Sequence, residues 1–219
     1  MTIFVRLLGV SILAIGLSAR AVSPTSIPTL KIGDRAPVLE SISWLQGNPV
    51  TKYAPRRVYV VEFWATWCPP CIKAIPHLSA IQKKYANTLT VIGVNADGIL
   101  GGKADVEAVH DFMKKHGKEM EYTVAMDDPV KKTMSETWVT ASGSLGAPTA
   151  AIVDRRGKLV WIGYPNVPKG YPFDQALADT LSGKIDLERS RALQAETIKE
   201  TAKYWATKSQ ESPWPPGEP

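Results

Sequence analysis

The stretch VYVVEFWATWCPPC, residues 58–71, decides the fold, because it joins a buried strand directly to a pair of cysteines. Its first part, Val58–Ala65, is a run of apolar, β-branched and aromatic residues, which is typical of a buried strand. Apolar residues then recur at steps of three and four, which marks one face of a helix: Ile72, Ile75, Leu78, Ile81 and Tyr85. Pro69 and Pro70 fall in its first turn, where missing N–H groups are tolerated. The sequence therefore predicts a strand, a tight turn and a helix that begins at the cysteines.

Cys68 and Cys71 are the only cysteines of the chain. A disulfide between residues three apart closes too small a ring to stabilise a fold much, because the gain grows with loop length. Two residues at this spacing on a helix are neighbours, so the bond itself is within reach. The free N–H groups and the dipole at a helix N-terminus lower a thiol pKa from ~8.5 towards 7 or below. The pair therefore indicates redox chemistry, while a zinc site would need further ligands that no histidine supplies at finger spacing.

The rest of the chain alternates strands with helices. The pattern predicts strands over Leu89–Asn95, Tyr122–Met126, Thr149–Val153 and Leu159–Ile162, and helices over Val106–Gly117, Val130–Trp138, Phe173–Gly183 and Leu187–Thr207. Such alternation is typical of an α/β protein with a mainly parallel sheet covered by helices on both faces. We expect four to five strands, the last two forming an antiparallel hairpin at one edge, followed by a C-terminal helical extension.

The segment Glu62–Cys71 resembles the active-site segment of the thioredoxin superfamily. Together with the lead-in Gly33–Pro37, it is most similar to the exported TlpA/DsbE-like (redoxin) branch, and the resemblance covers about residues 30–183. It implies a thioredoxin-like mixed sheet and a thiol–disulfide oxidoreductase with no bound cofactor and no metal. In this family the first cysteine attacks a substrate disulfide and the second resolves the mixed disulfide. Cys68 is therefore the expected nucleophile and Cys71 the expected resolving cysteine.

The resemblance also assigns roles to residues outside the cysteine pair. Glu62 lies inside the apolar strand, where burial of an unpaired carboxyl raises its pKa, and the family uses an acid at this position as proton acceptor for the resolving cysteine. Pro148, preceded by Ala147, matches the family's cis-proline, which faces the cysteines and presents backbone to the substrate. Trp67, Pro69 and Pro70 complete the expected substrate-binding surface.

Two departures from the family pattern bear on proton handling. The TlpA-like branch frequently has a glutamate three residues after the second cysteine, where this chain has Ala74. Thioredoxin itself pairs its buried acid with a lysine on the next strand, and the matching position here is Gly93. Proton transfer would then rest on Glu62 and water.

The ends of the chain differ in composition from its middle. An apolar run, Leu7–Leu17, is followed by alanines 19 and 21 in the spacing cut by signal peptidases, and it is shorter than the roughly 20 residues that span a bilayer. We expect residues 1–21 to be a signal peptide, or else an uncleaved N-terminal anchor. Residues 22–37 are predicted to be a linker, 38–184 the thioredoxin-like domain, and 185–219 a C-terminal helix with a Pro-rich tail. The protein is then periplasmic or secreted, with membrane contact only if the anchor remains.

The net charge of +5 does not indicate nucleic-acid binding, because Lys and Arg are spread along the chain without an aromatic-interleaved basic block. The expected partners are disulfide-containing proteins and, for a reductase, a membrane or envelope electron donor. Three other functions stay open on sequence alone: a disulfide oxidase, a thiol peroxidase and a non-enzymatic Cu(I) carrier using both thiolates.

Overall fold

The computed structural model describes residues 28–40, 42–99, 105–167 and 170–208. The strands are β1 (Ile42–Gln46), β2 (Val58–Trp64), β3 (Leu89–Asn95), β4 (Thr123–Asp127), β5 (Thr149–Val153) and β6 (Leu159–Gly163). The helices are α1 (Pro69–Lys84), α2 (Val106–His116), α3 (Phe173–Ser182) and α4 (Leu187–Lys208), with a 3-10 turn η2 (Gly117–Glu119) and a π-helical segment η3 (Ser135–Thr140). The expected signal segment and the Pro-rich tail lie outside the described residues.

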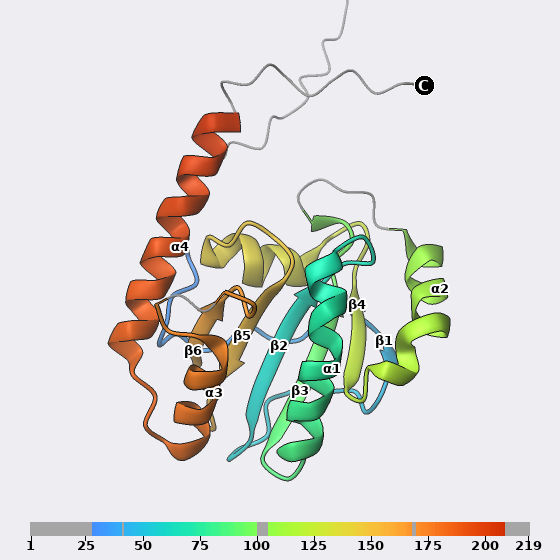
Figure 1. The fold of residues 1–219 in the computed structure, drawn as a ribbon, viewed down its shortest axis with the longest axis horizontal. Coiled ribbons are helices and arrows are strands. Elements are labelled where there is room, and N and C mark those ends of the chain that lie inside the picture. The colour runs from blue at the N-terminus through green and yellow to red at the C-terminus, as the bar shows by residue number, and fades with distance from the viewer. Residues whose placement is uncertain (1–27, 41, 100–104, 168–169, 209–219) are drawn as a thin grey trace, which may run out of the picture.

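One sheet contains the six strands in the order β1-β4-β3-β2-β5-β6 (Figure 1). β2 pairs in parallel with β3, and β3 with β4, while the β1–β4, β2–β5 and β5–β6 pairs are antiparallel. The predicted mixed, thioredoxin-like α/β class is confirmed. The sheet has one strand more than the four to five expected, because β1 adds an antiparallel strand at the far edge. The expectation of a mainly parallel sheet is wrong, because β5 pairs antiparallel with the central strand β2.

Strand β1 follows no strong sequence signal. Its residues are partly exposed, and the register against β4 shifts between Trp44 and Gln46. An edge strand buries less surface than a central one, so its pattern is weaker than the continuous apolar run of β2, in which every residue is buried.

Alternate residues of β2 point into two separate cores. Val58, Val60 and Trp64 belong to the cluster under α1 and α3, which also holds both cysteines. Tyr59, Val61 and Phe63 belong to the cluster on the other face, with Trp138 of η3. Since side chains alternate along a strand, Glu62 lies on the α1 face of the sheet. Figure 1 shows α1 running across that face.

The segment predicted as a helix over Val130–Trp138 is displaced towards the C-terminus, with π-helical geometry over Ser135–Thr140. Asp127, at the end of β4, determines this start. Its carboxylate accepts the backbone N–H of Met134 at 3.0 Å, and the N–H and hydroxyl of Ser135 at 2.8 and 2.7 Å. The side chain therefore satisfies free N–H groups where the helical segment begins.

The lead-in and the C-terminal helix pack on the domain together. Leu30 and Ile32 are buried in the second core, and α4 lies along β6 (Figure 1). Between them, the buried Gln194 of α4 donates to the carbonyl oxygens of Leu30 and Ser142, at 2.7 and 3.3 Å, and accepts the N–H of Ile32 at 3.1 Å. One amide side chain thus joins three segments.

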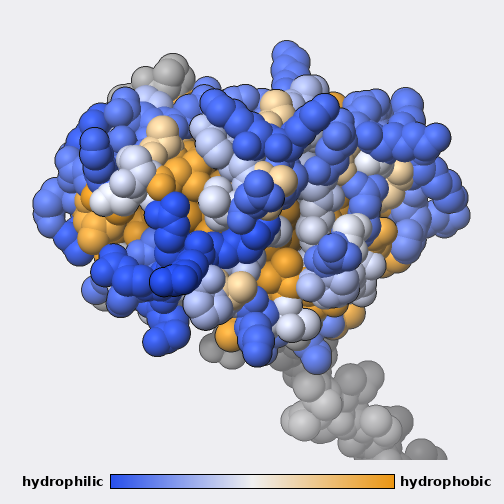
Figure 2. Space-filling model, turned by 90° about the horizontal axis from the view of Figure 1, so that it is seen from below, coloured by the Kyte–Doolittle hydropathy of each residue, from blue (hydrophilic) through white to orange (hydrophobic). Residues whose placement is uncertain are grey.

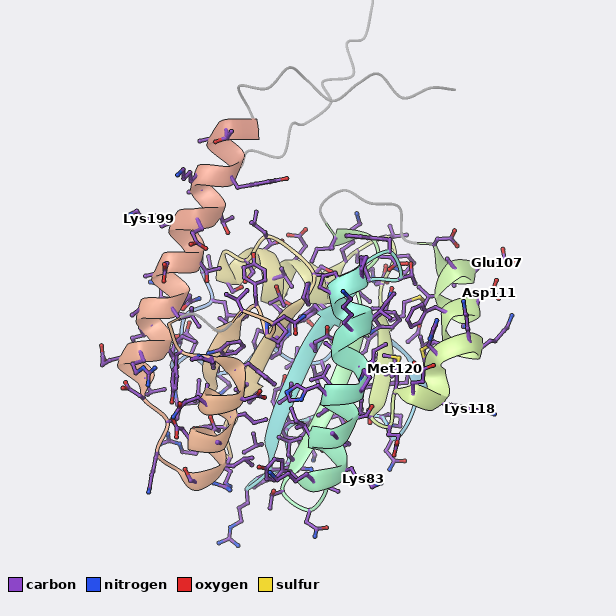
Figure 3. All side chains as sticks on the ribbon, viewed as in Figure 1. Lys83, Glu107, Asp111, Lys118, Met120 and Lys199 are labelled. Carbon is purple, nitrogen blue, oxygen red and sulfur yellow. A yellow bond between two sulfur atoms is a disulfide. The ribbon has the colours of Figure 1, made fainter. Side chains whose placement is uncertain are left out.

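The outer face of α2 carries acidic side chains. In Figure 3 the labelled Glu107 and Asp111 lie on the outer side of α2, whereas Met120 points into the molecule, where it is buried. Figure 2 looks at the end of the sheet where β2 begins, and hydrophilic residues cover most of it. No helix within the described ranges is long and apolar enough to cross a membrane.

Candidate active site

The cysteine pair lies where β2 ends and α1 begins. Cys68 has extended backbone angles, φ −104° and ψ 94°, and is the N-cap of α1, with Pro69 and Pro70 in the first two helical positions. Neither proline could donate a hydrogen bond, so the first amide of the helix is that of Cys71. This N–H donates to the Sγ of Cys68 at 3.3 Å. The two consecutive prolines thereby direct the first free amide onto the sulfur of Cys68.

Cys68 and Cys71 form a disulfide with a Cα–Cα distance of 5.3 Å. Their exposed fractions are only 3% and 2%, whereas Pro69 and Pro70 are exposed at the rim. No acidic residue occupies the first turn of α1. The positive end of the helix dipole therefore favours negative charge on the Cys68 sulfur without a competing carboxylate in that turn.

Asp97 braces the turn that precedes the cysteines. It follows β3, and its carboxylate accepts the Thr66 backbone N–H at 2.7 Å, the Thr66 hydroxyl at 2.8 Å and the Asn95 amide at 3.0 Å. The Trp67 indole N–H lies 3.4 Å from the backbone oxygen of Asp97. The sequence reasoning missed this residue. The sequence does carry a signal for it. Asp97 closely follows β3, the parallel neighbour of β2, so it falls at the edge of the sheet where β2 ends and the cysteines begin.

Replacing Asp97 with alanine should destabilise the oxidised protein by about 1–3 kcal/mol, because it leaves the partly buried Thr66 N–H without its acceptor. Urea unfolding followed by circular dichroism measures the change. The control is Asp111→Ala, since Asp111 is exposed on α2 and its ion pair with Lys114 lies in solvent. Equal stability of the two variants would show that Asp97 does not brace the turn.

Pro148 lies beside the end of β2. The Ala147–Pro148 peptide bond is cis, and the next residue, Thr149, is paired with Phe63. Pro148 is buried, and Ala147 packs against the core cluster that contains both cysteines. The hydroxyl of Thr149 donates to the carbonyl of Gly146. The structure therefore brings Ala147 and Pro148 to the same edge of the sheet as the cysteine pair.

Glu62 is buried, with an exposed fraction of 1%, between Gly93 of β3 and Ala150 of β5. Its Oε1 has no hydrogen-bond partner in the described protein. Burial raises the pKa of the carboxyl from 4.5 to about 8. The prediction that Gly93 occupies the strand position beside the buried acid is confirmed, so no lysine stands there.

The exposed rim of the site is the turn of Trp67, Pro69 and Pro70, and the loop after β6 contacts it. Trp67 is 52% exposed, in contrast to the buried Trp64, whose ring packs against Phe112 with centroids 4.9 Å apart. The Asn166 side chain, from the loop after β6, donates to the backbone oxygen of Pro70 at 3.1 Å. Sequence reasoning missed Asn166, because no local pattern indicates a contact between residues so far apart along the chain.

The sequence profile of the family described as Redoxin matches residues 31–180. The chain belongs to the redoxin family. This redoxin is 30% identical over 137 residues to protein FixW of Rhizobium leguminosarum, in a match that spans 62% of the chain and 61% of FixW. It is 28% identical to the thiol-disulfide oxidoreductase ResA of Bacillus cereus, over 60% of the chain and 68% of ResA. It is 27% identical to the thiol:disulfide interchange protein HelX of Rhodobacter capsulatus, over 63% of the chain and 70% of HelX.

Solved structures resemble the redoxin in fold. A thiol-disulfide isomerase from Corynebacterium glutamicum superposes with a TM-score of 0.53 at 24% identity, covering 67% of this chain and 97% of the other. The thioredoxin domain of a thiol-disulfide oxidoreductase from Bacteroides vulgatus gives a TM-score of 0.51 at 21% identity, covering 72% and 99%. The thioredoxin-like fold is therefore shared well beyond the segment around the cysteines.

Proposed function

We propose that this redoxin is an exported protein-disulfide oxidoreductase that reduces disulfides of other exported proteins. The observation that carries the proposal is the Cys68–Cys71 disulfide in the first turn of α1, with the Cys71 amide donating to the sulfur of Cys68. Hydrogen-bond donors at a helix N-terminus stabilise a thiolate, which is the reactive form of cysteine. The names of ResA and HelX support the same class of reaction.

The first step is attack of the reduced Cys68 thiolate on one sulfur of a substrate disulfide. A bond forms between Cys68 and that sulfur, the substrate S–S bond breaks, and the other substrate sulfur leaves as a thiolate that takes a proton from water. In the second step the Cys71 thiolate attacks the sulfur of Cys68 and displaces the remaining substrate sulfur. Two electrons have then passed to the substrate, and the protein holds the Cys68–Cys71 disulfide.

Glu62 is the proposed proton acceptor for Cys71 in the second step. It is buried on the sheet face that α1 covers, beside the core cluster that holds both cysteines. A pKa of about 8 lets the carboxyl exist in both protonation states near neutral pH, which suits a group that accepts and returns a proton.

The substrate segment is proposed to lie on the exposed rim formed by Trp67, Pro69 and Pro70, and to pair with the backbone at Ala147 and Pro148. Its sulfur must approach a nearly buried Cys68 from that rim. Residues 1–21 are proposed to direct export as a signal peptide or to remain as an anchor, residues 38–184 to be the catalytic domain, and a membrane or envelope protein to return electrons.

The reduction potential of the Cys68–Cys71 pair tests the proposal. The protein is equilibrated in thiol buffers of defined potential, and its free thiols are alkylated and counted by mass. A potential near or below ~−250 mV supports a reductant, whereas one near ~−120 mV indicates an oxidant of folding proteins. A pair that shows no two-electron couple contradicts the redox function and brings forward a Cu(I) carrier, which an anaerobic Cu(I) titration against Cys68→Ser would identify.

A further inference from the structure

Three buried polar atoms on the Glu62 face make no hydrogen bond to the described protein: Glu62 Oε1, Trp64 Nε1 and the Tyr122 hydroxyl oxygen. Glu62 and Trp64 are two residues apart on β2 and therefore share a face. Tyr122 directly precedes β4. An indole N–H can only donate and an ionised carboxylate can only accept, while a phenol can donate its proton. The set thus contains two donors and one acceptor.

Gly93 brings these groups together. It is the strand neighbour of Glu62, and a Cβ placed on it would meet Cε2 of Tyr122 at 3.0 Å and Nε1 of Trp64 at 3.3 Å. The tyrosine ring and the indole therefore cover the position where Gly93 has no side chain. In this chain, the Tyr122 ring and the Trp64 indole occupy the space that a side chain at position 93, next to Glu62, would need.

The other groups that face Glu62 are few. From α1 the titratable neighbours are the cysteines, here joined in a disulfide, and the buried residues of β3, β5 and α3 on this face are uncharged: Leu89, Val91, Asn95, Ala150, Ile152, Phe173, Ala176 and Leu177. On α2, the ring of His116 packs at a tilt against that of Phe112, which also contacts the ring of Trp64. Burial, and then the charge of Glu62, raise the pKa of Tyr122, so its phenol keeps its proton.

We infer that Tyr122 is a positioning residue for the proton-transfer step, and that its hydroxyl, together with the Trp64 N–H, stabilises the carboxylate form of Glu62. The inference rests on the proposed role of Glu62 as proton acceptor. In that step the Cys71 S–H bond breaks and an O–H bond forms on Glu62, while Tyr122 retains its own proton. Neither donor is hydrogen-bonded to the described protein, so both are available to bond Glu62 once its carboxyl ionises, and such bonds would lower its pKa and oppose the effect of burial. Tyr122 thereby keeps Glu62 usable as a base closer to neutral pH.

The test is the Tyr122→Phe substitution, which keeps the ring over Gly93 and removes only the hydroxyl. The Glu62 carboxyl carbon is followed by NMR across pH in the full-length oxidised protein, and its midpoint should rise by about half to one pH unit. The NMR signal of the Trp64 indole N–H should shift with pH and show the same midpoint. In the reduced protein, resolution of a mixed disulfide at pH 7 should slow about three- to tenfold, and the deficit should vanish well above the midpoint. Tyr85→Phe, at the opposite end of α1, is the matched control and should change none of these.

An unchanged Glu62 midpoint in Tyr122→Phe overturns the inference. This holds also if Tyr122→Phe lowers the free energy of unfolding without changing that midpoint. Gly93→Ala is a second variant, since its methyl group would displace the Tyr122 ring and should also raise the midpoint. A different result would show that the proposed role of Glu62 as proton acceptor is wrong. If the midpoint shifts but Glu62→Gln resolves mixed disulfides with unaltered rate and pH dependence, then Glu62 is not the base, and Tyr122 has no part in the reaction.

Discussion

Cys68→Ser is expected to abolish turnover, and Cys71→Ser to trap substrate proteins in a stable mixed disulfide on Cys68. Serine at position 68 cannot form the mixed disulfide, so exchange should fall by at least about a thousandfold. Serine at position 71 leaves the nucleophile intact and removes the group that releases the substrate. The asymmetry follows from the structure. Cys68 is the N-cap of α1 and its sulfur accepts a hydrogen bond from the Cys71 amide, whereas Cys71 lies within the helix.

The measurement combines steady-state reduction of a disulfide-containing peptide with non-reducing electrophoresis and mass spectrometry of the trapped species. The double variant Cys68→Ser/Cys71→Ser is the control and should trap nothing. Equal loss of turnover in both single variants, with no covalent adduct on Cys71→Ser, would contradict the assigned roles. If the adducts formed on Cys68→Ser instead, Cys71 would be the nucleophile and Cys68 the resolving cysteine.

Glu62→Gln should make the protein more stable at alkaline pH. Between its ordinary pKa of 4.5 and its folded value of about 8, the folded state holds a proton that the unfolded state has released. The stability of the natural protein therefore falls as pH rises through this window. Glutamine does not titrate, so above pH 8 the variant should be more stable by a few kcal/mol, with about 5 kcal/mol as the upper limit. Urea unfolding at pH 5 and pH 9 measures the difference, which should be small at the lower pH.

The same substitution should slow resolution of the mixed disulfide by about a hundredfold near neutral pH, since general-base catalysis by a positioned side chain supplies this much or more. At high pH hydroxide can deprotonate Cys71, so the deficit should shrink. Stopped-flow kinetics with a preformed mixed disulfide follows the step directly. A deficit of the same size at every pH would point to altered packing around residue 62 instead of lost proton transfer.

The sequence predicted those features whose causes are local. The continuous apolar run of β2 and the two prolines in the first turn of α1 follow from short stretches of chain. The position of Gly93 beside Glu62 follows from the resemblance to thioredoxin. Strand β1 was missed, because a partly exposed edge strand has little hydrophobic signal of its own. Asn166 and Tyr122 were missed for a different reason, since each acts on a segment far away in sequence. Asp97 also acts at a distance, although its position just after β3 was a signal for its place at that edge of the sheet.

The displaced helical segment after β4 illustrates the same limit. Apolar spacing suggested a start near Val130, but the carboxylate of Asp127 bonds the amides of Met134 and Ser135 and so determines where the helical segment begins. Spacing indicates which face of a helix is buried, whereas its end depends on which polar group is available to bond the free amides.

Gln194 has a consequence for how the chain can be cut or rearranged. Its amide holds residues near the beginning of the described chain and the helix near its end in one hydrogen-bonded set. A protein shortened after residue 184 would therefore lose more than an appendage: it would leave Leu30, Ile32 and Ser142 with unpaired backbone groups. A circularly permuted chain that joined the two ends and opened elsewhere would keep them. The contact of α4 with the lead-in beside β6 therefore joins the two ends of the described chain.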